Sequence, residues 1–375
     1  MRIRLVMGAT LLCLSARVIA ADLHVDPEQG DDVRNGVDHP VRTIGRAIEL
    51  AQAGDTIHLL PRVYRDWAGF FDKSGEPDRP ITLDGHGATL DGCDPLDPEG
   101  WREVEPGLYQ QADLMPLTDA IIDRWFFVMG GKLNRMQRCS KGPSEPLKAP
   151  GELIPGEWTF VKNTERTQSA KAGYIHGTFW IKLPPGQTLA DARIEYPLRM
   201  AGVAMHGKCA HLMVRSLTST RPYNDGFNLA DCQNVVFKNI RAIDYGDDGV
   251  SAHGVCCYRV DGFQSIGNAT GICDTGDSIT SYRSVYIDRC IGFDLYFLDT
   301  GRCSIADAHI RSSAGSSQIF GLPLVARGIR ASNGLGNFDV PMAEWNFMML
   351  ILWQRSMREM LDNQRNAIGD RSAGF

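Results

Sequence analysis

The segment between Leu212 and Val255 contains the same pattern of apolar and polar positions twice. The sequence NDGFN at residues 224–228 is followed 23 residues later by DDGVS at residues 247–251. The upstream apolar residues keep the same step, with Leu212, Val214 and Leu217 matched by Val235, Phe237 and Ile240. A repeat this short cannot enclose its own core and has to stack on its neighbours. The pattern therefore predicts two coils of a β-solenoid, whose parallel strands lie about 4.8 Å apart.

Further coils are predicted on both sides of this repeat. Short strands are expected at 56–60, 81–83 and 88–90, and the strand pattern recurs at 258–266, 285–290, 305–310 and 324–329. A short amphipathic helix precedes them: Thr43 is a suitable N-cap, and Ile44, Ala47, Ile48 and Ala51 share one face. Such a helix closes the open end of a solenoid, whose first strand otherwise exposes unpaired backbone groups.

The period is lost between about residues 101 and 200. Strand signals separated by Pro and Gly turns, such as HGTFWI at 176–181 followed by LPPG at 183–186, predict a small antiparallel β insert there. Its Trp158 and Trp180 either stack on sugar rings or form the core of the insert.

The predicted domains follow from these changes of pattern. Residues 1–20 are a signal peptide, 21–100 the N-terminal cap and first coils, 101–200 the β-rich insert, 201–335 the main coils and 336–375 a C-terminal capping helix and tail. The apolar run at 347–353 in the last segment is too short to span a bilayer. This helix either caps the last coil or contacts another subunit or a membrane surface.

The first 20 residues have the features of a secretory signal. Arg2 and Arg4 precede an apolar run at 5–14, and the small residue Ala20 suits cleavage. A membrane anchor is the alternative, but the run is shorter than the roughly 20 residues that a spanning helix needs. We therefore expect a secreted or periplasmic protein without a membrane span.

The charge of the chain excludes some partners. The formal net charge is -6, and cleavage after Ala20 makes it -9 because Arg2, Arg4 and Arg17 leave with no acid. An acidic exported protein is a poor binder of nucleic acid and of anionic membranes. The same sign weakly disfavours a polyanionic substrate, although a local basic groove would override it.

Nine of the ten cysteines follow the predicted cleavage site. Cys209, Cys232 and Cys256 are 23 and 24 residues apart, which is the step of the repeat. Equivalent positions stack on successive coils, so these thiols are expected to form a buried ladder. Disulfides are the alternative, because export permits them.

Several N-terminal motifs carry a resemblance to a known superfamily. They are VDP at 25–27, GDD at 30–32, RTI at 42–44, GDTI at 54–57 and VY at 63–64, with Ala47 and Ala51 between them. This segment resembles the opening of exported pectin-lyase-like proteins, and the resemblance implies an all-β, right-handed parallel β-helix. The insert resembles the β insertion of some β-helix glycosidases, including enzymes that act on xylosides and fucosides.

The two repeated motifs also supply the candidate catalytic groups. Asp225 and Asp248 are expected one coil apart, about 5 Å, with Asp247 beside them. Glycosidic cleavage uses two carboxyl groups, one protonated and one ionised, and crowding them separates their pKa values. A spacing near 5 Å suits retention of configuration, whereas splayed turns would give the inverting spacing.

The acid pattern resembles that of polygalacturonase-like glycoside hydrolases, which have one Asp and then an Asp pair on the next coil. The resemblance implies acid and base roles for Asp225, Asp247 and Asp248. The chain departs from that family after the acids, because residues 269–272 read ATGI and no lysine follows Lys238. His253 is the remaining candidate for a catalytic histidine, on the same coil as the Asp pair.

Other polar residues are expected near these acids. Asn228, Ser251 and His253 should face outward, because Phe227 and Val250 should face the core. The candidate substrate-binding residues are Tyr223, Asn224, Asn228, Tyr245 and Ser251, and His206, Asp244, Asp274 and Asp277 are possible neighbours. Two alternatives stay open for the acids: they are turn residues that only stabilise the solenoid, or they bind calcium.

Three functions are compatible with the sequence. The first is a secreted glycoside hydrolase acting on a polysaccharide or oligosaccharide, with no cofactor unless calcium binds. The second is a polysaccharide lyase or epimerase, which needs a strong base and a cation beside a uronate carboxyl. The third is a non-catalytic carbohydrate-binding or surface protein. No oligomeric state is predicted.

Overall fold

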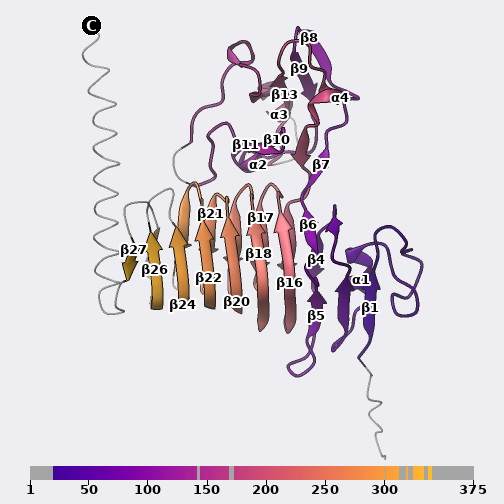
Figure 1. The fold of residues 1–375 in the computed structure, drawn as a ribbon, viewed down its shortest axis with the longest axis vertical. Helices are drawn as coiled ribbons and strands as arrows, with labels where there is room; N and C mark the ends of the chain where they lie inside the picture. The colour runs from indigo at the N-terminus through magenta and orange to yellow at the C-terminus, as the bar shows by residue number, and fades with distance from the viewer. Residues whose placement is uncertain are drawn as a thin grey trace, which may run out of the picture.

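A computed structural model describes residues 20–141, 144–168, 173–299, 301–311, 318–319, 324–332 and 337–339 of the 375-residue chain. The chain forms a solenoid of parallel β-strands with a separate β-rich unit above one edge, as Figure 1 shows. This confirms the parallel β-helix predicted from the sequence. The proposed signal peptide, apart from Ala20, and the proposed C-terminal helix lie outside the described residues.

A twelve-stranded sheet forms one wall of the solenoid. Its strands are β1 (Asp22–Val25), β2 (Thr56–Leu59), β3 (Val63–Tyr64), β5 (Ile81–Asp84), β6 (Thr89–Asp91), β16 (Leu212–Thr220), β18 (Val235–Ile243), β20 (Cys257–Ile266), β22 (Ile279–Asp288), β24 (Arg302–Arg311), β26 (Leu324–Ser332) and β27 (Asn337–Asp339). Val214 pairs with Phe237, and Leu217 pairs with Ile240. The repeat read from the sequence is therefore the register of this sheet.

A seven-stranded sheet forms the facing wall. Its strands are β4 (Ala68–Phe71), β15 (Ala201–His206), β17 (Asp225–Ala230), β19 (Asp248–His253), β21 (Thr270–Asp274), β23 (Phe293–Phe297) and β25 (Gln318–Ile319). Phe227 pairs with Val250, which pairs with Ile272. Both walls are parallel apart from the terminal β26–β27 pair.

Several long strands of the larger sheet contain one left-handed residue at the same place in the coil. In β16, β18, β22 and β24 these are Ser216, Asn239, Ser284 and Asp307, with φ between 51° and 56°. The left-handed residue shifts the alternation of side chains, so that Val214 and Leu217, three residues apart, are both buried. Asn and Asp tolerate this conformation better than most residues.

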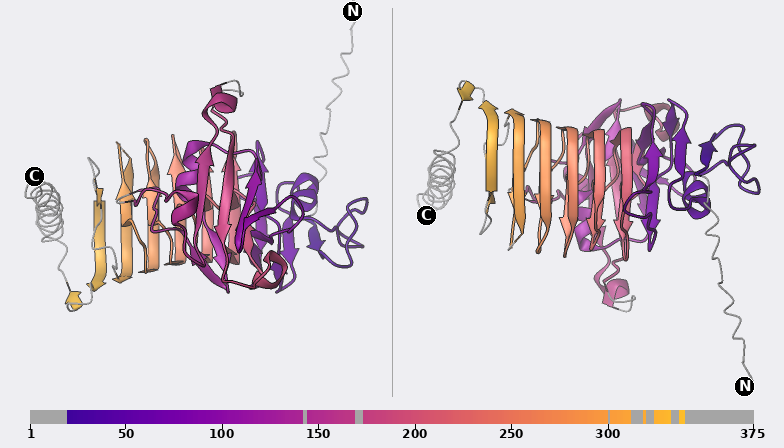
Figure 2. Two further views of the ribbon diagram at one scale, coloured as in Figure 1. Left: turned by 90° about the horizontal axis from the view of Figure 1, so that it is seen from above. Right: turned by 90° about the horizontal axis from the view of Figure 1, so that it is seen from below.

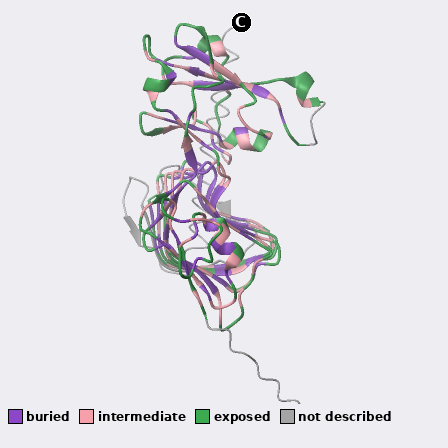
Figure 3. Ribbon diagram, turned by 90° about the vertical axis from the view of Figure 1, so that its right-hand side faces the viewer, coloured by how far each residue is buried: buried purple, intermediate pink, exposed green. Residues whose placement is uncertain are grey.

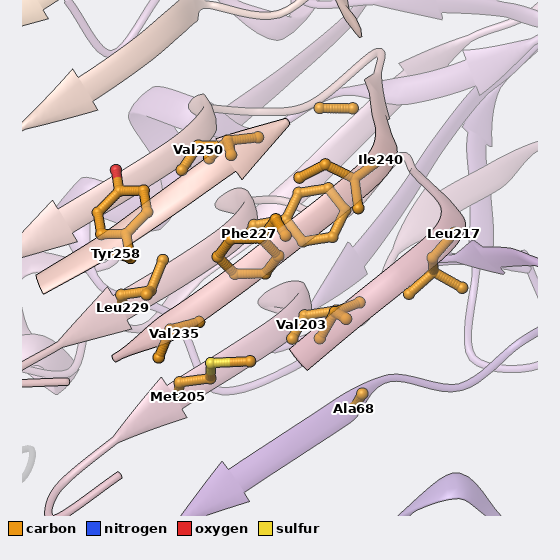
Figure 4. Packing of buried hydrophobic residues seen from close by; sticks show 14 of the residues in the cluster. Ala68, Val203, Met205, Leu217, Phe227, Leu229, Val235, Ile240, Val250 and Tyr258 are labelled. Carbon is orange, nitrogen blue, oxygen red and sulfur yellow. The ribbon is translucent and has the colours of Figure 1, made fainter. Parts of the chain in front are cut away.

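The space between the walls is filled by apolar side chains from both sheets. Phe227, Leu229 and Val250 of the smaller sheet meet Val235, Ile240 and Tyr258 of the larger one, as Figure 4 shows. The helix α1 (Ile44–Leu50) covers the N-terminal end of this core with Ile44, Ala47 and Ile48. Thr43 caps it by accepting a hydrogen bond from the Arg46 amide, as predicted.

The expected column of thiols is part of this core. Cys209, Cys232 and Cys256 are all buried, and their Sγ atoms donate to backbone carbonyls, as Cys232 does to Met205 at 3.0 Å. All nine cysteines of the described chain are free thiols. The ladder is therefore confirmed in preference to the disulfide alternative.

The β-rich unit lies between two adjacent coils. β4 and β5 precede it, yet they pair directly with β15 and β16, which follow it. It contains two antiparallel sheets: β7 (Cys93–Pro95), β10 (Phe127–Met129), β11 (Lys132–Asn134) and β14 (Glu195–Pro197) form one, and β8 (Arg102–Glu105), β9 (Leu108–Ala112), β12 (Trp158–Lys162) and β13 (Gly177–Lys182) form the other. The unit also contains α2 (Asp119–Arg124), α3 (Thr164–Gln168), α4 (Leu189–Ala192) and a 3-10 turn at Pro150–Glu152.

This unit has a core of its own, separate from that of the solenoid. Trp125, Phe127, Trp158 and Phe179 pack together at its centre. Trp158 is fully buried and its Nε1 donates to the Asn134 carbonyl, so it is a core residue rather than a platform for sugar. In the left view of Figure 2, from above, the unit lies over the coils that follow it. Figure 3 shows it above the solenoid, whose strands are largely buried. Its loops therefore reach the strands that carry the repeated acids.

Candidate functional site

The three acids singled out in the sequence lie side by side where two strands of the smaller sheet begin. Asp225 and Asp248 are the first residues of β17 and β19, and Asp247 comes directly before β19. The pairing of Phe227 with Val250 places Asp225 and Asp248 at the same position of adjacent coils. Carboxylate oxygens of the three residues lie within 4.8 Å of one another. The predicted juxtaposition is therefore present.

The acids are much less accessible than expected. Their exposed fractions are only 1% for Asp225, 2% for Asp247 and 1% for Asp248. A segment of the β-rich unit, residues 139–141, closes over them, and we call it the closing segment. The acids thus face away from the solenoid core, as predicted, but they do not face solvent.

Lys141 of the closing segment bridges two of the acids. Its Nζ lies 2.6 Å from Asp247 Oδ1, and 2.8 and 2.9 Å from the two oxygens of Asp248. The Ser140 hydroxyl also donates to Asp247 Oδ1. Because buried charges need close partners, these contacts account for a carboxylate pair at this depth.

Arg124, the last residue of α2, pairs with the acids from another direction. Its Nε lies 2.8 Å from Asp247 Oδ2, and its Nη1 donates to the Asn224 side chain. Asp247 therefore has a cation on each of its two oxygens. Asn224 in turn donates to Asp225 Oδ2 at 3.0 Å, which joins both coils into one network.

These surroundings separate the three pKa values. Burial raises the pKa of Asp225 to about 6 and that of Asp248 to about 7, and the negative charge of Asp247 contributes to both shifts. Burial also acts on Asp247, but Lys141 and Arg124 outweigh it and hold its pKa below the usual value. Near neutral pH the cluster therefore combines an ionised Asp247 with a carboxyl that can hold a proton.

The outward face of the smaller sheet carries the remaining predicted polar residues. The Asn228 side chain donates to Asp225 Oδ2, and its Oδ1 is hydrogen-bonded to His206 Nε2. His253 Nε2 lies 3.0 Å from the Ser251 hydroxyl, and its Nδ1 lies 3.3 Å from that of Thr275. Burial lowers the pKa of His253. His253 therefore belongs to a second hydrogen-bonded group, beside the acid cluster.

Two residues named as candidates near the acids point into the solenoid instead. Tyr245 is fully buried in the main core, where its ring fills the space left by Gly226, so it is not available to a substrate. Asp274 is also buried and accepts hydrogen bonds from Tyr258, Thr280 and Tyr282. Asp274 is two residues after Ile272 on the same strand, so both side chains point into the solenoid. The spacing of the sequence is irregular at this coil and did not predict this direction.

Two other candidates lie near the site without joining the acid network. Tyr223 is half-buried, and burial raises its pKa. Asp244 lines a cavity of about 530 Å³ between the β-rich unit and the solenoid, and burial raises its pKa. Cys139 of the closing segment lines the same cavity and its thiol bonds to the Lys141 carbonyl. The closing segment therefore separates this cavity from the acids.

The sequence analysis missed Arg124, Ser140 and Lys141. Ser140 and Lys141 are 107 and 106 residues from Asp247 in the chain. They lie in the aperiodic insert, so no repeat or spacing connects them to the acids. A buried cluster of three carboxylates does require nearby cations, and the predicted cluster thus implied such residues without identifying them.

The three carboxylates could also hold a hard cation such as calcium, which prefers carboxylate oxygens. One oxygen from each acid lies within 4.8 Å of the others, which suits a shared ion. Lys141 Nζ is bonded to two of the three acids in this arrangement. Calcium and the Lys141 ammonium would therefore compete for the same oxygens.

No family model matches the chain. Pectate lyase PEL9 of Emericella nidulans is 34% identical over 79 residues, which are 20% of this chain and 19% of the fungal protein. The match thus spans less than a fifth of that relative's length.

Solved structures with a similar course include XylC in complex with xylose, with a TM-score of 0.47, 13% identity and coverage of 83% of this chain and 68% of that one. A lacto-N-biosidase of Eubacterium ramulus is also similar, with a TM-score of 0.31 and 12% identity. The match covers 82% of this chain and 43% of that one.

Within the described residues, no helix is long and apolar enough to cross a membrane. The two walls of parallel strands, in register from coil to coil, form a parallel β-helix, as the sequence predicts.

Proposed function

We propose that the chain is a carbohydrate-active enzyme that hydrolyses a glycosidic bond at Asp225, Asp247 and Asp248. The observation that carries this proposal is the cluster itself: three buried carboxyl groups on adjacent coils, each with one oxygen within 4.8 Å of the others. An ionised Asp247 lies beside Asp248, whose pKa is about 7, and such a pair supplies the base or nucleophile and the acid of glycoside hydrolysis.

The spacing of the acids bears on the stereochemistry. Their nearest oxygens lie within 4.8 Å, which is close to the separation of about 5–5.5 Å in retaining enzymes. An inverting enzyme needs about 6.5–9.5 Å to place a water between its carboxyl groups. We therefore propose retention of anomeric configuration.

Substrate must reach the acids by displacing the closing segment. Lys141 covers Asp247 and Asp248, and it is the residue that a sugar hydroxyl would replace. The cavity on the other side of this segment is a suitable approach, since its 530 Å³ could receive one or two sugar rings.

The lining of this cavity favours an acidic sugar. Lys132, Arg135, Arg138 and Arg289 contribute positive charge, against the single carboxyl of Asp244. The cavity is therefore a basic groove, although the chain as a whole has a negative net charge. A uronic acid or another anionic saccharide is therefore the proposed substrate class.

A polysaccharide lyase is the second candidate, and Arg124 and Lys141 favour it. They provide the cations that the sequence analysis did not find near the acids, and such cations could neutralise a uronate carboxyl. A lyase also needs a neutral base, and the pKa of Lys141 argues against that role: burial lowers it, but Asp248 and Asp247 outweigh burial and raise it above its usual value. Hydrolysis therefore remains the better proposal.

The test is turnover of a panel of neutral and uronic oligosaccharides, with reducing ends and the ultraviolet absorbance of unsaturated products measured together. We expect new reducing ends without absorbance, and a loss of roughly 10²- to 10⁴-fold for Asp247→Asn and Asp248→Asn. Asp261→Asn, on the exposed face of β20, is the matched control. Absorbance would identify a lyase, and inactivity of the folded wild type on the whole panel would favour a binding protein.

We also propose export to the periplasm or the medium, supported by the sequence of residues 1–20. The mass of the protein recovered from the medium or periplasm tests this, since cleavage removes about 20 residues.

A further inference from the structure

A cluster of histidines lies on the outward face of the larger sheet, at the N-terminal coils. His24, His58 and Asp84 occupy the same position on β1, β2 and β5, because His24 pairs with His58 and His58 pairs with Asp84. The ring of His58 stacks between those of His24 and His86, with centroids 5.3 and 5.2 Å apart. The acid cluster, in contrast, is on the smaller sheet, so the two groups are separate.

Three donor atoms of this cluster lie within 4.8 Å of one another and so surround one shared point. His58 Nδ1 lies 2.9 Å from His86 Nε2, which lies 3.6 Å from Asp84 Oδ2. In a tetrahedral zinc site with bonds of 2.0–2.1 Å, neighbouring ligand atoms are about 3.3 Å apart. The two observed separations lie on either side of that value, so small side-chain shifts would complete the geometry.

Asp22 orients His58 for this role. Its Oδ1 lies 2.9 Å from His58 Nε2, on the far side of the ring from His86. A proton donated from Nε2 to Asp22 leaves the lone pair of Nδ1 directed at the shared point. Carboxylates hold metal-binding histidines in this way, and they fix the tautomer as well as the ring orientation.

Asp84 and His86 are also held in place. His86 has a left-handed backbone, with φ of 49°, in the turn between Gly85 and Gly87, and its amide donates to Asp84 Oδ1 at 3.1 Å. Arg215 Nε donates to Asp84 Oδ2 at 2.7 Å. The His86 side chain is 47% exposed, which leaves a side of the site open to water.

We propose that His58, Asp84 and His86 bind a divalent transition-metal ion of the zinc class, with water as the fourth ligand. Two imidazoles and a carboxylate suit zinc and its neighbours better than calcium or magnesium, which prefer all-oxygen sites. The ion would link β2 to β5 and the turn after it. It therefore stabilises the N-terminal coils, and this role is independent of the acid cluster.

The test is calorimetric titration of the full chain, free of any polyhistidine tag and treated with a chelator, with zinc chloride. We expect one site per chain, a loss of roughly 100-fold in affinity for His58→Ala and for His86→Ala, and about 10-fold for Asp22→Asn. His24→Ala is the matched control, because this residue stacks on His58 but contributes no donor atom to the converging set. Zinc should raise the unfolding temperature of the wild type and of His24→Ala equally, that of Asp22→Asn by less, and that of His58→Ala and His86→Ala least.

Three results would overturn the proposal. They are the absence of zinc binding by the wild type, equal zinc affinity of wild type and the His58→Ala/His86→Ala double variant, and loss of binding in His24→Ala alone. Circular dichroism of each variant shows whether the solenoid is intact. Calcium chloride and magnesium chloride, titrated in the same way, should bind to this site at least roughly 100-fold more weakly than zinc chloride.

Discussion

The Nζ of Lys141 lies 2.8 and 2.9 Å from the two oxygens of Asp248, so one ammonium holds both oxygens of a carboxylate that is only 1% exposed. The lysine comes from the aperiodic insert and the aspartate from the solenoid. This contact is one of those through which the two parts of the chain depend on each other.

Replacing Lys141 with Met should therefore destabilise the protein. The change leaves the acids buried without this cation, and breaking a buried pair in this way costs about 3–5 kcal/mol. Chemical unfolding at pH 8 measures the loss. At pH 5 the loss should be smaller, because Asp248 can then be protonated and needs no counter-charge.

Lys148→Met is the control for that experiment. Lys148 Nζ pairs with Glu157 on the more exposed surface of the β-rich unit, where an ion pair contributes less than about 1 kcal/mol. If the two variants lost similar amounts of unfolding free energy, the buried contacts of Lys141 would contribute no more to stability than an exposed ion pair.

Asp274 should make stability depend on pH. Burial raises its pKa from 3.8 to about 6, so the folded state holds a proton that the unfolded state releases. The resulting stabilisation is complete below about pH 3.8 and is lost as the pH rises through 6. Its size is about 3 kcal/mol, at 1.36 kcal/mol per pKa unit.

The measurement for Asp274 is the unfolding free energy of wild type and of Asp274→Asn between pH 3 and 8. As the pH rises over this range, the unfolding free energy of the variant should increase by about 3 kcal/mol relative to that of the wild type. Asp261→Asn, which alters an exposed carboxyl, should run parallel to the wild type. A pH-independent difference for Asp274→Asn would contradict the assignment.

Gly226 should not tolerate a side chain. A Cβ there would lie 2.5 Å from the Gly249 carbonyl oxygen and 2.7 Å from the Tyr245 ring, and the backbone atom cannot move without displacing the next coil. We expect Gly226→Ala to cost about 1–3 kcal/mol. Gly45→Ala is the control: a Cβ added there would have no atom within 4 Å, and alanine in a helix should stabilise by about 0.5–1 kcal/mol.

The thiol ladder predicts an insensitivity to reductant. With Cys209, Cys232 and Cys256 free and buried, the thermal midpoint should be the same with and without dithiothreitol. A thiol reagent should react slowly with the native protein and with at least nine cysteines after unfolding. A fall of the midpoint in reductant would instead indicate disulfides.

The sequence was most informative where the chain repeats. Val214 and Phe237, or Asp225 and Asp248, are found together because a solenoid converts a fixed step along the chain into a contact in space. The same reasoning placed the cysteine column and the capping helix correctly. It could not find Lys141, because an insert without a period has no fixed relation to the coils.

The repeat also did not predict the direction of every side chain at the corners of the coils. Tyr245 was expected outside, but the missing side chain of Gly226 opens an interior space that its ring fills. Asp274 was a possible neighbour of the acids, whereas three hydroxyl groups of Tyr258, Thr280 and Tyr282 stabilise it inside the solenoid. Both cases depend on contacts between coils, which alternation along one strand does not encode.

The β-rich unit leaves and re-enters the solenoid through two strands that are paired with each other, β7 and β14, with Cys93 opposite Pro197. Its ends are therefore adjacent, and the coils before and after it are already in register. The whole unit can therefore be replaced in evolution without a change in the register of the coils beneath it. Under the proposed function, recognition of a new saccharide could thus arise by exchange of this one unit, provided that the replacement supplies the cations that Arg124 and Lys141 now place beside the acids.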